Sequence, residues 1–436
     1  MKSLTGKKLL ILGGGAATVN VVKQAKQLGL YTIVTGISDR GQAKDIADES
    51  LLIGSEEHDK LIDFIRQNHI DGVMTGSSEF QIRNMIELCQ KAGLPVYATK
   101  EQWDICQDKR NFKDLCARFG IPGVPEYDVN GSIPSHDFPV IVKPVDSCSS
   151  IGIRICRCPD ELQAAVLYAK QVSPSKRVLI EKYIENEGLT HVIKYAVIDG
   201  KFFMEVMGDR YVLNNGLITA LTLFPSKNTA LYLDSIDPKV EEMFRSIGFL
   251  NGVFFFQAIP DGESIYIYEM GLRTGGGMTY KITAESGGVN DLEMLIRYAV
   301  NGEMVDDGST IIIDPFLNGK KAASVAIPLR PGFINSISGI DSIQSIPGIV
   351  NFTRFYEVGD EVKPSYVNTL QQLYGRIMIV RNSEEELFDS LRILREIICI
   401  TGIDGQNMIL WDTFDKIYGD YLNRGDVTAS DKWVEY

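Results

Sequence analysis

Hydrophobic and polar positions along residues 7–100 alternate in a way that predicts strands and helices in turn. Short apolar runs at 7–12, 31–36, 71–76 and 95–99 predict buried strands. Amphipathic segments after the first run, over 59–67 and over 80–91 predict helices between them. Such a β-α-β alternation implies a parallel sheet covered by helices. We therefore expect an α/β domain over residues 1–100.

The pattern changes after residue 100. A helical stretch at 100–120 and a segment rich in Pro and Gly are followed by short strands and one helix over 160–171, which suits a small antiparallel α+β unit. Two apolar strands then face each other across Pro260–Glu263, and a helix follows at 289–302. The region 305–436 has further strands and a helix whose Ser383 and Glu386 fit a capping box. We expect three domains, 1–100, 101–304 and 305–436.

Charge and cysteine content restrict the classes of binding partner and the cellular location that we expect. The 436 residues carry a formal net charge of −13, which disfavours nucleic acid and anionic membranes as partners. No apolar stretch approaches the roughly 20 residues that span a bilayer, and the apolar N-terminal run continues as a strand, a turn and a helix rather than a signal peptide. Seven scattered cysteines indicate reduced thiols and a cytoplasmic protein.

A glycine-rich turn follows the first strand. Gly13, Gly14 and Gly15 leave backbone N–H groups and a helix N-terminus available for an anionic ligand. The dinucleotide fingerprint is incomplete, because Thr18 occupies its third glycine position and only Asp39 could meet a ribose. The turn therefore predicts a site for a small substrate, with NAD binding or a purely structural turn as alternatives.

A second candidate site combines a lysine with a hydroxyl-rich loop. Lys143 ends a buried strand, where a lysine needs a strong reason to be. Hydroxyl groups, backbone N–H groups and a lysine suit a nucleotide triphosphate. The alternative is a lysine that extends from the strand end to solvent. The loop residues that we expect to contact phosphates are Ser147, Ser149, Ser150 and Gly152.

The strand over 177–184 is a third candidate. Glu181 and Lys182 end it, and the backbone beyond them could pair with an adenine edge while Tyr183 and Ile184 pack against its face. Any edge strand can present this pattern, so an ordinary edge strand is the alternative.

The hairpin is the fourth candidate. Gln257 and Glu269 interrupt its apolar strands, and a three-residue loop or a bulge would place them on one face as diagonal neighbours, about 7–8 Å apart. Two such oxygen ligands can share a Mg²⁺ with phosphates; a simple pairing of the two side chains is the alternative. Arg273 lies four residues after Glu269, and Gly275 and Gly276 then allow a ligand to approach the backbone closely.

In this order, the motifs resemble the ATP-grasp superfamily, in the branch that includes biotin carboxylase, carbamoyl-phosphate synthetase and the L-amino-acid ligases. The resemblance covers nearly the whole chain. It rests on "ILGGGAA", "QDKRNFKDLCARFGIPGVP", "VIVKPVDSCSSIGI", "VLIEKYIE" and "FFFQAIP…YIYEMGLR". It implies a Rossmann-like first domain, an ATP-grasp domain with a mobile lid at about 112–182, and a C-terminal α+β region.

The resemblance also implies roles for single residues. Lys109 and Lys143 would hold ATP phosphates, the segment from Glu181 to Ile184 would meet adenine, and Gln257 and Glu269 would bind Mg²⁺, with Mn²⁺ as a possible substitute. Arg273, Lys143 and Arg210 are the catalytic candidates. The chain departs from the family at two places: Gly271 replaces a metal-binding Asn, and the ribose contact falls to Glu187 or His191, the latter being otherwise an ordinary surface histidine.

The implied reaction activates a small carboxylate as an acyl phosphate and joins it to an amine, with release of ADP. A homodimer is a further implication. Two other functions remain open from the sequence: an inactive ATP sensor, which the missing Asn would explain, and an NAD(P)-dependent oxidoreductase, which would use the first domain alone.

Overall fold

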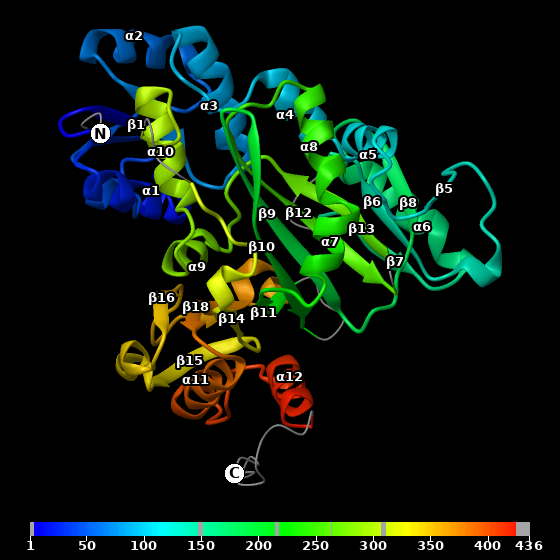
Figure 1. Ribbon diagram of the computed structural model, residues 1–436. Coiled ribbons are helices and arrows are strands. Elements are labelled where there is room, and N and C mark those ends of the chain that lie inside the picture. The colour runs from blue at the N-terminus through cyan, green and yellow to red at the C-terminus, as the bar shows by residue number, and fades with distance from the viewer. Residues whose placement is uncertain (1–3, 147–150, 214–217, 263, 307–310, 424–436) are drawn as a thin grey trace. The chain divides into compact units, whose positions relative to one another are not determined.

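The computed structural model describes residues 4–146, 151–213, 218–262, 264–306 and 311–423 (Figure 1). The chain forms two compact units. The first comprises Met1–Ile184, Val192–Met207 and Asn228–Pro315, and the second comprises Glu185–His191, Gly208–Lys227 and Phe316–Tyr436. The chain therefore passes between the units several times. The three-domain division expected from the sequence stays a prediction.

The first unit begins with a four-stranded parallel sheet in the order β3-β2-β1-β4. Helices α1 and α10 contact each other and the sheet, α3 contacts β4, and α2 packs against α3 (Figure 1). The predicted parallel sheet with covering helices is confirmed. The elements are β1 (Lys8–Leu12), α1 (Ala16–Gln27), β2 (Tyr31–Thr35), β3 (Glu49–Leu51), α2 (His58–Asn68), β4 (Gly72–Thr75), α3 (Glu79–Ala92) and α10 (Asp291–Asn301).

The strand predicted at 95–99 is wrong. This segment links α3 to α4 without joining a sheet. Its apolar residues are buried by tertiary packing instead: Tyr97 is 7% exposed, and its hydroxyl donates to the carbonyl of Leu272 at 2.9 Å. A short apolar run indicates that a segment is buried, but it does not distinguish a strand from a buried loop between two helices.

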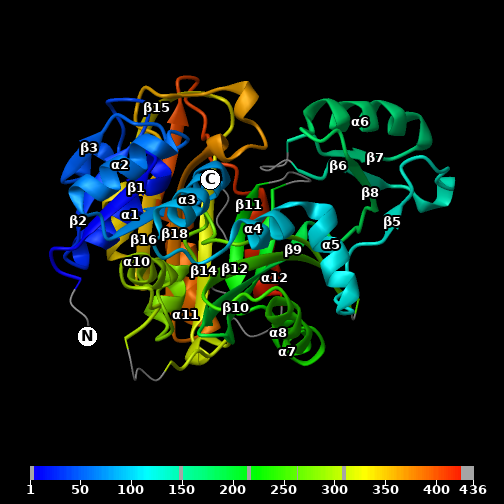
Figure 2. The same ribbon diagram turned by 90° about the horizontal axis from the view of Figure 1, so that it is seen from above.

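A second, antiparallel sheet has the order β5-β8-β6-β7, and Figure 2 shows α6 lying across it. Val140, Val142 and Ile180 from the strands pack with Ala165 and Ala169 of the helix. This is the small α+β unit that the sequence predicts. Its elements are β5 (Glu126–Tyr127), β6 (Val140–Pro144), β7 (Arg154–Cys156), α6 (Pro159–Val172) and β8 (Val178–Lys182).

The remaining strands of the first unit follow the order β13-β12-β9-β10, and α5, α7 and α8 pack on them through aromatic side chains. Phe254 of β12 stacks on Phe244 of α8, with ring centroids 4.1 Å apart, and Phe256 stacks on Phe112 of α5 at 5.8 Å. The elements are α4 (Lys100–Gln107), α5 (Lys109–Arg118), β9 (Leu189–Ile198), β10 (Lys201–Val212), α7 (Thr229–Ser235), α8 (Asp237–Ser246), β12 (Gly252–Asp261), β13 (Ser264–Gly271) and α9 (Tyr280–Glu285).

In the second unit, the end of β10 continues the strand order β10-β11-β14-β18-β16, and a separate small sheet has the order β17-β15-β19. Helices α11 and α12 contribute to its core, where Phe388 stacks on Tyr421. Ser383 caps α11 by accepting from the N–H of Glu386 at 3.1 Å. The elements are β11 (Thr219–Phe224), β14 (Lys321–Pro328), β15 (Gly332–Ser338), β16 (Ile349–Arg354), β17 (Glu361–Val362), β18 (Leu373–Arg381), α11 (Glu384–Ile397), β19 (Cys399–Gly402) and α12 (Asp412–Leu422).

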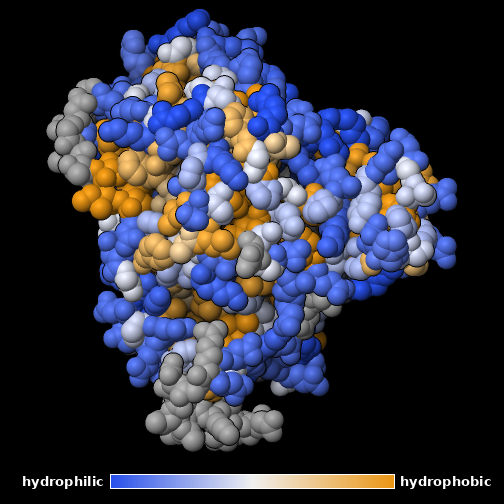
Figure 3. All heavy atoms as spheres, turned by 45° about the vertical axis from the view of Figure 1, so that its right-hand side comes forward, coloured by the Kyte–Doolittle hydropathy of each residue, from blue (hydrophilic) through white to orange (hydrophobic). Residues whose placement is uncertain are grey.

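Polar residues dominate the face drawn in Figure 3, with apolar patches between them. Among the described residues, every helix is too short or too polar to cross a membrane. The six described cysteines are all free thiols, as the scattered cysteine pattern predicts.

Candidate active site

The floor of the site is one face of the β12–β13 hairpin. Successive residues of a strand point to opposite faces, so Phe254 and Phe256 enter the aromatic core while Phe255 and Gln257 face the other way. An irregularity in pairing next to Gln257 places it directly opposite Glu269, and Phe255 lies directly opposite Gly271. The predicted bulge is confirmed, but the two polar residues are direct rather than diagonal neighbours.

The two predicted metal ligands have different partners. Oε1 of Gln257 accepts a hydrogen bond from the Tyr268 hydroxyl at 2.8 Å. Oε1 of Glu269 lies 3.4 Å from Nζ of Lys109, and the two side chains are 33% and 13% exposed. Glu269 is therefore accessible, and it lies next to the lysine for which the sequence predicts a phosphate contact.

Lys109 is held by its place at the start of α5. Asp108 caps this helix, and its Oδ1 accepts from the N–H groups of Arg110 at 2.9 Å and Asn111 at 3.0 Å. The N–H of Lys109 itself donates to the carbonyl of Val145, just beyond β6, at 3.0 Å. The cap and this tether fix the backbone from which the lysine extends.

Lys143 belongs to a buried charge cluster rather than extending to solvent. It is 5% exposed, and its Nζ lies 2.6 Å from Oε2 of Glu181. The other oxygen of Glu181 accepts from Nζ of Lys113 at 2.7 Å, and Lys113 also lies 2.6 Å from Glu126. Burial alone would raise the pKa of Glu181, but the ammonium groups of Lys143 and Lys113 outweigh it and hold the pKa below its usual value.

The cluster reaches the hairpin through Tyr268. Nζ of Lys143 lies 5.9 Å from the centroid of the Tyr268 ring, and the hydroxyl of the same ring binds Gln257. A cation at this distance is attracted by the ring face. The predicted phosphate-binding lysine and the predicted metal ligand are thus coupled through one aromatic side chain.

The predicted adenine segment lies at the end of β8. Its backbone donors are engaged, since the N–H of Lys182 donates to Pro125 at 2.9 Å and that of Tyr183 donates to Pro139 at 3.1 Å. Lys182 is exposed and Ile184 is buried. An adenine at this edge would therefore use carbonyl groups or side-chain packing rather than these two donors, and the carboxylate of Glu181 is committed to the lysines.

The predicted phosphate loop is described only in part. Ser147, Ser149 and Ser150 lie outside the described residues. Gly152 has a positive φ of 84°, and a Cβ there would lie 2.6 Å from Cγ of Pro144. This position therefore requires glycine.

Arg273 follows the hairpin and lies over the face that carries Phe255. Its guanidinium lies 5.2 Å from the centroid of the Phe255 ring, and its Nη2 lies 3.1 Å from Oε1 of Glu79 at the start of α3. Gly275 and Gly276 follow in an open segment, where an added Cβ would have no neighbour closer than 3.7 Å. Arg273 therefore presents a cation beside the glycine segment, oriented by a carboxylate and a ring.

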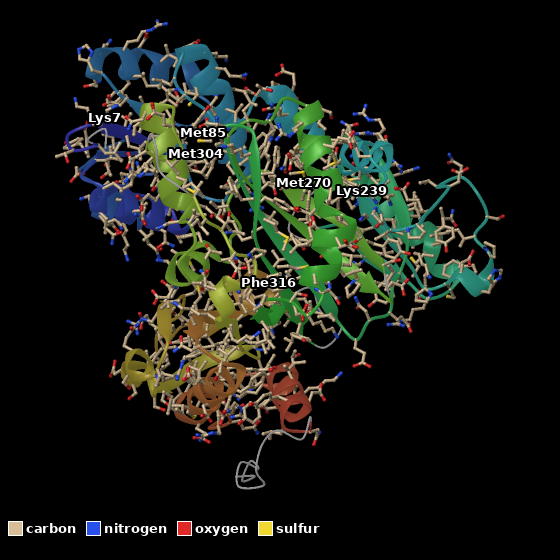
Figure 4. All side chains as sticks on the ribbon, viewed as in Figure 1. Lys7, Met85, Lys239, Met270, Met304 and Phe316 are labelled. Atoms are coloured by element: carbon tan, nitrogen blue, oxygen red, sulfur yellow. The ribbon has the colours of Figure 1, made fainter. Side chains whose placement is uncertain are left out.

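Two pockets flank the start of α3. The first, of about 500 Å³, is lined by Glu79, Lys109 and Glu269 together with residues of α4, α5 and the segments around the phosphate loop. Met270 lines it from β13 and is labelled in Figure 4. This pocket brings together predicted phosphate and metal contacts, and we call it the reaction pocket.

The second pocket, of about 350 Å³, is lined by the glycine turn, and we call it the glycine pocket. Gly13, Gly14 and Gly15 all line it, as the sequence predicts for a ligand site at this turn. Phe80 of α3, the neighbour of Glu79, lines it from the other side.

Three predicted residues lie in the second unit. Arg210 donates to Oγ1 of Thr219. Burial of the Arg376 guanidinium and, to a smaller extent, the positive charge of Arg210 lower the pKa of Arg376 to about 10. The surface interpretation of His191 is wrong, because the ring is fully buried with Nδ1 3.0 Å from Oδ1 of Asp209. Glu187 is exposed and pairs with Lys416 at 2.7 Å.

The residues on the hairpin face fit a magnesium–nucleotide complex. Gln257 and Glu269 offer oxygen atoms, which Mg²⁺ prefers, on one face and near lysines. In the described part of the chain, no group of three or more His, Cys, Asp and Glu side chains could hold a metal ion. A metal bound here would therefore complete its shell with phosphate oxygens and water. Gly271 adds no ligand, and the Phe255 ring fills the space beside it, 2.5 Å from where its Cβ would be.

Known proteins share both the sequence pattern and the architecture. The family model described as D-ala D-ala ligase C-terminus matches residues 128–214. Formate-dependent phosphoribosylglycinamide formyltransferase of Sulfurisphaera tokodaii is 21% identical over 419 residues, covering 91% of this chain and 97% of that protein. The L-amino acid ligase of Bacillus licheniformis superposes with a TM-score of 0.74 at 19% identity, over 91% of this chain and 99% of that one.

The chain has the ATP-grasp fold. A further structural neighbour places nucleotide in this fold: the biotin carboxylase domain of 2-oxoglutarate carboxylase from Hydrogenobacter thermophilus, a dimer in complex with ADP, magnesium and bicarbonate. It matches with a TM-score of 0.71 at 20% identity, over 93% of this chain and 92% of that one. The resemblance drawn from the order of the motifs is confirmed, and ATP and Mg²⁺ are the ligands typical of the fold.

Two residues of this candidate site were not predicted from the sequence. Lys113 lies one helical turn after Lys109, a spacing that places both on one side of α5 and could have indicated it. Glu79 comes from the start of α3, far from Arg273 in the sequence. Only the folded chain brings this pair together.

Proposed function

We propose that the chain is an ATP-dependent ligase that activates a small carboxylate as an acyl phosphate and joins it to an amine, releasing ADP and phosphate. The observation that carries the proposal is the pairing of Lys109 with Glu269 at 3.4 Å on the face that also bears Gln257. The names of the similar proteins include an L-amino acid ligase and a formate-dependent formyltransferase, which supports a carboxylate as one substrate.

The chemistry requires two anions to approach each other. A carboxylate oxygen attacks the γ-phosphorus of ATP, the bond from that phosphorus to the β,γ-bridging oxygen breaks, and ADP leaves. Lys109 and Lys143 would bind phosphate oxygens and Arg273 the carboxylate, so that positive charge offsets the repulsion and holds the reactants in line. The amine then attacks the acyl carbon, phosphate leaves and the nitrogen loses a proton.

Glu181 serves this step indirectly. Its carboxylate, bound to Lys143 and Lys113, fixes the ammonium groups without exposing a negative charge to the nucleotide, since it is only 2% exposed. It is therefore a positioning residue.

Gln257 and Glu269 would hold Mg²⁺, with Mn²⁺ as a possible substitute. When bound, the ion supplies positive charge to the phosphate oxygens. The loop that contains Ser147, Ser149, Ser150 and Gly152 would cover the phosphates and exclude water from the acyl phosphate. Contacts of Glu187 or His191 with ribose and of Arg210 with an anion stay predictions, as do the cytoplasmic location and a homodimer.

An ATP sensor without turnover is the second candidate, and Gly271 favours it because one metal ligand of the usual set is missing. The oxidoreductase alternative has no comparable support, since the matching family model and the similar structure carry the names of ligases.

ADP release tests the proposal. The full chain is supplied with ATP, Mg²⁺ and pools of amino acids and other small carboxylates, and Glu269→Ala and Lys143→Ala are run beside it. The ligase function requires release that depends on one acid and one amine and disappears in both variants. Tight ATP binding without release in any pool would contradict it and support the sensor. Circular dichroism of each variant checks that loss of activity is not loss of folding.

A further inference from the structure

The glycine pocket has a floor made of backbone. A Cβ on Gly41 would lie 2.3 Å from the carbonyl oxygen of Gly14, and one on Gly14 would lie 3.1 Å from Cγ of Lys44. Contacts this close exclude larger residues. The lining consequently offers peptide groups rather than side chains at its base, and its volume of about 350 Å³ is at the lower end of the range for small-molecule sites, about 300–1,000 Å³.

The ammonium group of Lys44 at this floor already has hydrogen-bond partners within the protein. The ammonium of Lys44 donates to the carbonyl oxygens of Ser38 at 2.5 Å, Leu51 at 3.0 Å and Gly36 at 3.3 Å, which uses its three N–H bonds. Lys44 is 7% exposed. Burial lowers the pKa of Lys44, with Asp39 opposing the shift. The ammonium therefore supports the loop and is not directed at a ligand.

The rim of the pocket is apolar and exposed. Ile37 and Phe80 both line it, and they are 83% and 59% exposed. Single exposed apolar residues are common on protein surfaces and need no explanation. Two large ones at the mouth of the same small pocket are a different case, because a ligand that covered both would remove their apolar surface from water. The two exposed charges in the lining, Arg40 and Glu56, are opposite in sign.

The start of α3 connects this pocket to the chemistry. Glu79 lines the reaction pocket, and the next residue, Phe80, lines the glycine pocket. Consecutive Cα atoms are about 3.8 Å apart, so the two pockets adjoin the same point of the backbone at the start of α3.

We propose that the glycine pocket takes the apolar side chain of an amino-acid substrate, with Ile37 and Phe80 as its specificity-determining residues. The inference rests on the ligase function proposed above and narrows it: aliphatic and aromatic amino acids are preferred over sugar acids, phosphorylated acids and amino acids with charged side chains.

Steady-state ADP release with a defined panel tests this preference. The panel contains leucine, phenylalanine, serine, aspartate, phosphoserine and gluconate, each with the amine pool. The variants are Phe80→Ser and Ile37→Ser, and Leu250→Ser is the matched control, because Leu250 is 61% exposed and is not part of the pocket.

The wild-type chain is expected to use leucine or phenylalanine with a kcat/KM at least about tenfold above that of serine, and Phe80→Ser to reduce this ratio about tenfold or more, mainly through KM. Leu250→Ser should leave the ratio unchanged. A preference for gluconate, phosphoserine or aspartate, or an unchanged ratio in both pocket variants, would overturn the inference while the ligase function stood.

Calorimetric titration of leucine and phenylalanine into the full chain, with Mg²⁺ and a non-hydrolysable ATP analogue, separates the two proposals. Binding that weakens about tenfold or more in Phe80→Ser, without ADP release from any acid, would support the pocket and reject the ligase. Absence of both binding and turnover with leucine and phenylalanine would overturn the pocket inference.

Discussion

Nζ of Lys109 lies 3.4 Å from Oε1 of Glu269, which joins the start of α5 to the hairpin. The contact places the predicted phosphate-binding lysine beside the predicted metal ligand. Both side chains retain exposed surface, so a magnesium–nucleotide complex could exchange this ion pair for contacts of its own. The pair is therefore a convenient place to test how the site binds metal.

Glu269→Gln should reduce ADP release by at least about 100-fold at low Mg²⁺, because the amide removes the negative charge that would hold the ion beside the phosphates. Raising the Mg²⁺ concentration should restore part of the rate. The measurement is the Mg²⁺ concentration that gives half-maximal ADP release. Asp261→Asn, an exposed change at the other end of β12, serves as control. An unaltered Mg²⁺ dependence in Glu269→Gln would show that this carboxylate is not a metal ligand.

Glu181→Gln should destabilise the first unit by about 3–5 kcal/mol at neutral pH, because it leaves two buried lysines without their shared carboxylate. The surface change Glu241→Gln, which breaks an exposed pair with Arg245, should cost less than about 1 kcal/mol. Differential scanning calorimetry at pH 7 compares the two. Equal transition temperatures for both variants would contradict the structural role of Glu181.

The same carboxylate gives a pH dependence with a defined sign. The pKa of Glu181 is lower in the folded than in the unfolded chain, because the two ammonium groups outweigh burial. The contribution of Glu181 to stability is therefore fully present above its pKa in the unfolded chain, about 4.3. This contribution is lost as the pH falls through the lower pKa of the folded chain. Below pH 4, the difference in stability between wild type and Glu181→Gln should narrow. A difference that stays constant down to pH 2 would exclude this titration as the cause.

A second buried cluster gives a pH dependence of stability with the opposite sign. Lys194 binds Asp291 at 2.5 Å and Glu205 at 3.3 Å, and all three side chains are at most 4% exposed. Burial first, and the Asp291 carboxylate second, raise the pKa of Glu205 well above its usual value. Glu205 consequently holds a proton in the folded chain at pH values where it is ionised in the unfolded chain.

Since the pKa of Glu205 is raised in the folded chain, protonated Glu205 contributes fully to stability below its unfolded pKa of about 4.3. This contribution decreases as the pH rises toward the pKa of the folded chain. Glu205→Gln resembles the protonated acid in shape and does not titrate. As the pH rises above the unfolded value, the unfolding free energy of this variant should therefore fall less than that of the wild type. Urea denaturation at several pH values measures this, and parallel curves for the two proteins would argue against a bound proton.

Local sequence patterns predicted the parts of the fold and site that depend on local periodicity. Alternation along the hairpin placed Gln257 and Glu269 on one face once a bulge was allowed, and the structure confirms that face. The pairing of Arg273 with Glu79 could not be predicted, because it depends on how separate elements pack. For the same reason, burial of His191 was missed and the apolar run at 95–99 was mistaken for a strand.

Gly271 stands where the ATP-grasp motif usually has an Asn, and Phe255 is its neighbour on the hairpin. They face each other across the hairpin, and a Cβ on Gly271 would lie 2.5 Å from Cε1 and 2.6 Å from Cζ of the Phe255 ring. Gly271→Asn should therefore destabilise the chain by about 1–3 kcal/mol through overpacking. Gly275→Ala, where the nearest atom to an added Cβ is 3.9 Å away, is the control and should have little effect.

Combining Phe255→Val with Gly271→Asn should relieve the clash, because the smaller side chain leaves room for the amide. Residues two apart on a strand share a face, so Asn at 271 would add an oxygen on the side of Glu269. The double variant should then reach half-maximal ADP release at a lower Mg²⁺ concentration than Phe255→Val alone. If the two variants require the same Mg²⁺ concentration, position 271 does not reach the metal and Gly271 is not the reason for any weakness of the site. If the double variant regains only stability, Phe255 and Gly271 matter for packing alone.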